Sequence, residues 1–220
     1  MSKKTGKDPV IEERKYVYCI IANTEKPASF GNKGIGNFSE VYTIPYKGIS
    51  AVVSDTPLTD YQSTEENIKA HNEVATLVMK EHTVIPMAFG MAFKDKEVLL
   101  SVLEKSYDAI KKSLALLDNK VELGIKIVLG KELMELLGEK KIQFASYIFE
   151  SLKKKAVESV NAKLFSERLL LNASFLVEKN KIKEFSKEVD EVEKMLAPKI
   201  QYTGPWPPYN FVKIKIGGGE

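Results

Sequence analysis

The chain has 220 residues, of which 44% are apolar and 29% are charged, and its formal net charge is +3. Such a composition is typical of a soluble globular protein with one large domain or two small ones. The longest apolar runs fall far short of the roughly 20 residues that a membrane-spanning helix needs. The charged N-terminus lacks the apolar segment of a secretory signal, so we expect a cytoplasmic protein.

The basic residues argue against recognition of nucleic acid. Only Arg14 and Arg168 among the 33 cations are arginines. Proteins that recognise bases and phosphates depend on the guanidinium group of arginine. A chain whose basic residues are nearly all lysines is therefore not typical of a nucleic-acid-binding protein. The lone Cys19 excludes an internal disulfide bond and fits a reducing compartment.

Alternating and helical apolar patterns organise the first half of the chain. Residues 1–15 show no period and predict a disordered tail. Lys47 and Gly48 separate two strands and indicate a hairpin, and Ser63 with Glu66 forms a capping box that opens a helix. The predicted elements are strands over 16–21, 41–46 and 49–54, a helix over 64–81, a short strand over 84–89, a helix over 96–117 and a strictly alternating strand over 121–129.

A second half follows a break over residues 130–141, which we interpret as a hinge region. Its predicted elements are a helix over 142–164, a strand over 169–177, a helix over 182–196, and strands over 199–202 and 211–216, before a loose tail over 217–220. The chain is therefore predicted to be α+β, with domains over 16–129 and 142–216, each an open mixed sheet covered by helices. Both halves fit split βαβ relatives of the ferredoxin-like sandwich.

No set of residues with catalytic or metal-binding spacing is present. The glycines over 31–36 have the wrong spacing for a dinucleotide fingerprint and indicate a loop. His71 and His82 lie too far apart on one predicted helix to share a metal, and His71 is interpreted as a helix-face histidine with a buried partner. Cys19 has no cationic neighbour and is interpreted as a structural thiol. We expect no enzyme activity, no catalytic residue, no metal site and no cofactor.

The stretch TGPWPPYNFVKI over 203–214 is the most unusual part of the chain. Its prolines lack the backbone donor that a sheet ladder needs, so it predicts a stiff corner beside the sheet. In one interpretation the corner folds Trp206 down over the sheet edge, where the side chain is substantially buried. In the other, part of the apolar face of the corner stays accessible to a partner. The two are compatible. The hypothetical partner-binding residues are Trp206, Pro207, Tyr209 and Phe211, with Tyr209 nearer the rim.

Three stretches together resemble the gas vesicle protein F and L family. They are the opening strand YVYCIIAN, the region from His71 to Phe93 with VIPMAFGMAF, and GPWPPYNFV. The second is similar to the family pattern V-x-P-x-R-F-G-x-x-F, except that Ala88 stands where the family usually has arginine. This resemblance implies two domains, the second ferredoxin-like, and leaves any charged role of that strand in doubt.

The resemblance also implies a function. It indicates a gas vesicle assembly factor or minor structural component in the cytoplasm or at the vesicle, without a cofactor, that binds the apolar shell protein, gas vesicle protein A, and prevents its aggregation during nucleation. Other gas vesicle accessory proteins are further expected partners, whereas nucleic acid and lipid membrane are not. The alternatives are a peripheral membrane-surface protein and a small-ligand-binding α+β protein.

Overall fold

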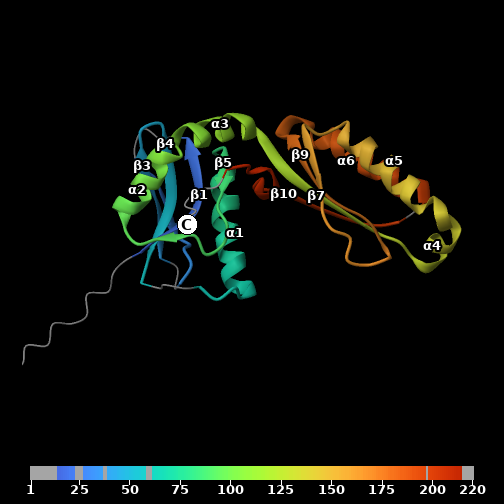
Figure 1. Ribbon diagram of the computed structural model, residues 1–220, viewed down its shortest axis with the longest axis horizontal. Coiled ribbons are helices and arrows are strands. Elements are labelled where there is room, and N and C mark those ends of the chain that lie inside the picture. The colour runs from blue at the N-terminus through green and yellow to red at the C-terminus, as the bar shows by residue number, and fades with distance from the viewer. Residues whose placement is uncertain (1–13, 23–26, 37–38, 58–60, 197, 215–220) are drawn as a thin grey trace, which may run out of the picture. The chain divides into compact units, whose positions relative to one another are not determined.

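The computed structural model describes residues 14–22, 27–36, 39–57, 61–196 and 198–214. It is α+β, as predicted, and forms two compact units, the first reaching Leu114 and the second comprising Ala115–Lys213 (Figure 1). Residues 1–13 of the tail predicted over 1–15, and the tail over 217–220, lie outside the described residues, whereas Arg14 and Lys15 belong to a strand and not to a tail. None of the helices in the described ranges is both long and apolar enough to cross a membrane.

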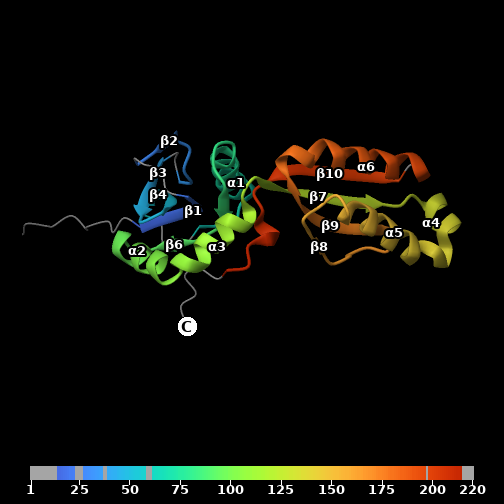
Figure 2. The ribbon, with the colours of Figure 1, turned by 90° about the horizontal axis from the view of Figure 1, so that it is seen from above.

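The first unit contains an antiparallel sheet in the order β2-β3-β4-β1-β5, with β6 also paired to β1. Its strands are β1 (Arg14–Ala22), β2 (Ser29–Asn32), β3 (Glu40–Tyr46), β4 (Ile49–Thr56), β5 (Val84–Pro86) and β6 (Ala92–Phe93). The central strand β1 is buried over most of its length because helices cover both faces of the sheet. Helix α1 (Glu65–Met79) contacts β1 and β5, and α2 (Lys96–Lys105) contacts β1, β3 and β6 (Figure 2).

Several local predictions for this unit need correction. The hairpin is confirmed, with Lys47 at a φ of 49° in its turn. The cap of α1, however, is Thr64, whose hydroxyl accepts a hydrogen bond from the Asn67 amide at 3.2 Å, so the predicted capping box is wrong. Gly31 lies within β2 and not in a loop. The predicted helix over 96–117 is two helices, because Ser106 leaves helical geometry between α2 and α3 (Tyr107–Leu117).

The second unit contains an antiparallel sheet in the order β10-β7-β9-β8. Its elements in chain order are β7 (Lys120–Val128), α4 (Lys131–Leu137), the short 3-10 helix η1 (Gly138–Lys140), α5 (Lys141–Lys153), β8 (Glu158–Asn161), β9 (Leu169–Glu178), the 3-10 helix η2 (Lys179–Lys181), α6 (Ile182–Leu196), β10 (Lys199–Trp206) and the 3-10 turn η3 (Tyr209–Phe211). Helices α5 and α6 pack together on one face of this sheet (Figure 2). This succession supports the ferredoxin-like arrangement, which remains a proposal.

The strand over 121–129 was predicted correctly as a strand but placed in the wrong domain. It is β7, and it lies at the centre of the second sheet between β9 and β10. Its apolar residues Val121, Leu123, Ile125 and Ile127 stand opposite apolar residues of β9, from Val177 to Leu171, and this pairing over long sequence distance decides its sheet. The predicted hinge over 130–141 is helical, since it forms α4 and η1. The predicted helix over 142–164 ends at Lys153, because β8 follows it and pairs with β9.

Candidate functional site

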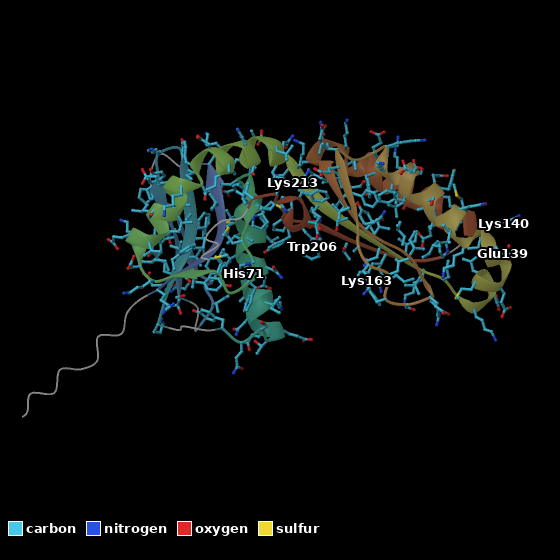
Figure 3. All side chains as sticks on the ribbon, viewed as in Figure 1. His71, Glu139, Lys140, Lys163, Trp206 and Lys213 are labelled. Atoms are coloured by element: carbon cyan, nitrogen blue, oxygen red, sulfur yellow. The ribbon has the colours of Figure 1, made fainter. Side chains whose placement is uncertain are left out.

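The segment from Trp206 to Lys213, which we call the strap, crosses the face of the second sheet that lies opposite α5 and α6. Trp206 pairs with Glu122 of β7, and the Asn210 side chain donates to Ser174 of β9 at 3.1 Å. Lys213 forms an ion pair with Glu158 of β8 at 2.5 Å. Figure 3 labels Trp206 and Lys213 on this segment. The strap therefore contacts three strands, and we call the sheet face beneath it the open face.

A buried carboxylate anchors the strap. Glu122 is only 6% exposed, and it accepts hydrogen bonds from the backbone and the side-chain amide of Asn210 at 2.9 and 2.5 Å. Because a carboxylate removed from water is costly unless it is hydrogen-bonded, these two donors account for its burial. The two hydrogen bonds between Asn210 and Glu122 hold the turn η3 against the sheet.

The apolar side chains of the strap divide into an inner and an outer group. Phe211 is 1% exposed and both Pro207 and Pro208 are buried, whereas Tyr209 is half-buried and Trp206 is 45% exposed. The expectation of a substantially buried tryptophan is therefore wrong. Trp206 ends an edge strand, and the turn η3 brings Phe211 into the interior position instead. The strap therefore exposes the Trp206 indole to solvent, whereas its Phe211 side chain is buried.

The predicted limits of the last strands also change. Strand β10 continues to Trp206, although its pairing with β7 is irregular between Thr203 and Trp206, where Gly204 and Pro205 lie. Gly204 has a φ of +110°, and a Cβ there would lie 2.7 Å from the Glu122 carbonyl oxygen, so this position requires glycine. The predicted strand over 211–216 is wrong for its described part, because Phe211 ends η3 and residues 212–214 are irregular; residues 215–216 lie outside the described ranges.

A shallow hollow lies on the open face beside Trp206. Its volume is about 250 Å³, and apart from the indole its lining is mainly polar. Gly124 forms part of the floor, where a Cβ would approach the Thr203 hydroxyl to 2.6 Å. The polar side chains of the lining are Glu122, Lys126, Asn172, Ser174, Gln201 and Thr203.

An apolar hollow of about 420 Å³ lies between α5 and the loop that joins β8 to β9. Phe149 and Leu164 line it, and Leu164 is 49% exposed. Two further apolar side chains of these segments are more exposed: Ile142 on α5 is 77% exposed, and Phe165 in the loop is 73% exposed. Figure 3 labels Lys140 just before α5 and Lys163 just before Leu164. We call Ile142, Phe149, Leu164 and Phe165 the apolar patch.

The apolar patch is not predicted by the sequence pattern. The helical apolar spacing continues to residue 164, and it therefore hides the loop and its two exposed apolar residues. The available signal was the pair Leu164–Phe165 within the otherwise polar run from Asn161 to Arg168. Two adjacent large apolar residues in a polar loop are a reasonable indication of a contact surface.

His71 belongs to the core of the first unit and not to a site. It is 1% exposed, as the prediction of a buried partner required. Its Nε2 donates to the Met87 carbonyl at 3.0 Å, so its Nδ1 is the acceptor for the Tyr16 hydroxyl at 2.8 Å. Burial lowers the pKa of His71 to about 4. Burial also raises the pKa of the Cys19 thiol, which fits a structural role.

Metal binding finds no support in the parts of the chain that the structure describes. Within them, no three or more His, Cys, Asp or Glu side chains gather closely enough to hold an ion.

Comparison with known proteins identifies the family. The model of the family described as gas vesicle synthesis protein GvpL/GvpF matches residues 14–135 and 127–213. This chain belongs to that family. It is 39% identical over 212 residues to gas vesicle protein F1 of Halobacterium salinarum, covering 94% of this chain and 97% of that protein. It is 36% identical to gas vesicle protein F of Haloferax mediterranei over 192 residues, covering 85% and 88% of the two chains.

Solved structures share the fold. The crystal structure of the gas vesicle protein GvpF from Anabaena superposes with a TM-score of 0.80 at 19% identity, covering 92% of this chain and 99% of that one. GvpF from Microcystis aeruginosa gives a TM-score of 0.77 at 19% identity, with 92% and 100% covered. The family assignment establishes a role in gas vesicle formation for this chain.

Proposed function

We propose that this protein is a gas vesicle assembly factor or minor structural component that binds the shell protein, gas vesicle protein A, and keeps it from aggregating during nucleation. The proposal includes residence in the cytoplasm or at the vesicle and no catalytic step. The apolar patch is the observation that carries it. Large apolar side chains that remain this exposed, with lysines beside them, are typical of a surface that meets another protein.

The physical argument concerns the partner's solubility. A subunit of a gas-facing wall exposes apolar surface while it is still in water, and that surface drives uncontrolled association. A protein that covers the surface stabilises the unassembled subunit by mass action. The apolar patch offers matching apolar area, and the open hollow beside it gives room for side chains of the partner.

The strap is the second part of the proposed contact. Trp206 and Tyr209 are accessible and are proposed to touch the partner, whereas Pro207 and Phe211 are proposed to act by holding the strap in place. An aromatic side chain on a fixed turn loses little conformational entropy when it binds, which favours its use in an interface.

Co-expression with the shell protein, followed by light scattering, tests the proposal. We expect clearly less aggregate when this chain is present. The double variant Leu164→Ser/Phe165→Ser should lose most of the protection, because both side chains are exposed and their loss leaves the core intact. Val98→Ser is the matched control, since Val98 is 41% exposed on α2 of the first unit, outside the patch.

The outcomes separate the possibilities. Equal aggregate with and without the chain contradicts the proposed function. Full protection by the double variant leaves the function standing but places the contact elsewhere. Flotation of the protein with anionic liposomes, abolished by the same double variant, assigns the patch to a membrane surface instead.

A further inference from the structure

The uncovered part of the open face carries positive charge without a matching carboxylate. Alternation along β7 and β10 places Lys126 and Lys199 on this face, together with Gln201 and Thr203. Both lysines are exposed, and neither forms an ion pair with any carboxylate in the described ranges. The face therefore presents two available cations.

The carboxylates of the same face are already engaged. Glu122 is buried and accepts both donors of Asn210, and Glu158 pairs with Lys213 of the strap. Lys213 of the strap neutralises Glu158, whereas the uncharged Asn210 satisfies hydrogen bonds of Glu122 without supplying a compensating charge. Glu122 also lines the hollow, but it is buried under the strap and lies four residues from Lys126 along β7. An anion approaching the uncovered end of the hollow from solvent therefore meets the exposed Lys126 first.

The rest of the hollow is suited to a polypeptide. Gln201 supplies a side-chain amide of the kind that pairs with a peptide backbone. Asn172 and Thr203 already donate to the Lys163 and Gly124 carbonyls, and their oxygens supply acceptors for a peptide N–H; Gly124 lowers the floor between them. Trp206 forms a wall, where an apolar side chain can pack against the exposed indole. The lining thus combines a cation, backbone-like polar groups and an aromatic surface.

We infer that this hollow binds an acidic, extended segment of a partner protein, with a carboxylate on Lys126 and an adjacent apolar side chain on Trp206. Single-stranded nucleic acid is the competing anion, but platforms that bind it stack successive bases on several aromatic side chains. This face offers one aromatic residue within the hollow. The inference goes beyond the proposed function: it shares Trp206 with the strap contact but adds a charged contact at Lys126 and a different kind of partner segment.

The protein carries its own probe for the test. Trp206 is the only tryptophan in the sequence and lies in the wall of the hollow, so its fluorescence reports occupancy directly. We would titrate the full chain with an eight-residue peptide containing three glutamates and one leucine among serine and glycine, and with the same peptide carrying glutamines. The acidic peptide should shift the emission to shorter wavelength and bind at least tenfold more tightly than its glutamine counterpart, with the difference shrinking in high salt.

Charge reversal provides the decisive comparison. Lys126→Glu should weaken binding of the acidic peptide at least tenfold, because it replaces attraction by repulsion at the hollow. Lys183→Glu is the matched control: it makes the same charge change at an exposed residue of α6, which covers the other face of the sheet, and should leave binding within twofold.

Three results would overturn the inference: no emission shift with the acidic peptide, equal binding of the glutamine peptide, or equal weakening by Lys126→Glu and Lys183→Glu. Tighter binding of a single-stranded oligothymidine than of the peptide would assign the hollow to nucleic acid. Because the assay contains no shell protein, its failure leaves the proposed function untouched.

Discussion

His71 shows how one buried side chain links the fold of the first unit to pH. Its two ring nitrogens join β1, through Tyr16, to the Met87 carbonyl beyond β5. The Tyr16 hydroxyl also accepts the backbone N–H of Gly90 at 3.1 Å. A proton on Nδ1 would remove the acceptor that Tyr16 uses, and burial further disfavours the charge.

We expect this histidine to make the protein less stable in acid. Its pKa is about 4 in the folded chain and 6.5 as its ordinary value, so between these limits the unfolded state binds more protons. The free energy of unfolding therefore falls as pH falls from 6.5 to 4, by up to about 3 kcal/mol from this residue. Above pH 6.5 the residue contributes no pH dependence. Urea unfolding at a series of pH values measures the slope.

The control for this prediction is His71→Gln, compared with His82→Gln. The His71 variant should be less stable at pH 7 but should show a flatter dependence on pH between 6.5 and 4. The His82 variant should keep the slope of the parent protein. Parallel slopes for the parent and His71→Gln would show that other groups cause the acid sensitivity.

Among the elements, the strap combines a supporting and a presenting role in one short segment. Phe211 is buried beneath it, and Glu122 with Asn210 fixes its turn to β7. Trp206 is nearly half exposed on the outer side. Folding and partner contact therefore depend on different residues of the same element.

Two truncations should separate these roles. Phe211→Ala removes a fully buried ring and is expected to cost about 3–5 kcal/mol of stability. Trp206→Ala should cost about 1 kcal/mol or less, because much of the indole already faces water, while weakening capture of the shell protein. Thermal melts beside a pull-down measure both effects. A larger loss of stability for Trp206→Ala than for Phe211→Ala would contradict the assignment.

Helices and strands with a strong apolar periodicity, such as β7 and α6, were predicted correctly from the sequence, whereas the short strand β8 was not. The alternation over 121–129 and the helical spacing over 182–196 correctly predicted β7 and α6. Strand β8 has four residues, too few to show a period, and it follows a helix whose apolar spacing continues past its end. Pairing with β9 decides its conformation, and that pairing involves residues distant in sequence.

The whole molecule consists of two units, and the sheet order predicts where the chain divides. We propose that residues 118–213 fold on their own, because they contain all four strands of the second sheet. A fragment over 142–216 follows the boundary expected from sequence but lacks β7, the strand between β9 and β10. Circular dichroism melts should show a cooperative transition for the first fragment and none for the second. A cooperative transition of 142–216 would show that β7 is dispensable.

The sequence by itself determined the α+β class, the elements with the clearest periodicity, such as β7 and α6, and the family resemblance, since these depend on local periodicity and on motifs contiguous in the chain. The tertiary structure decided which sheet receives β7, because an alternating strand does not specify its neighbours. It also decided that Phe211 and not Trp206 is buried, that Glu122 is paired with Asn210, and that Lys126 stands beside the indole. Each of these features depends on contacts between residues that lie far apart in the chain. The pattern of neighbouring residues in the sequence does not predict such contacts.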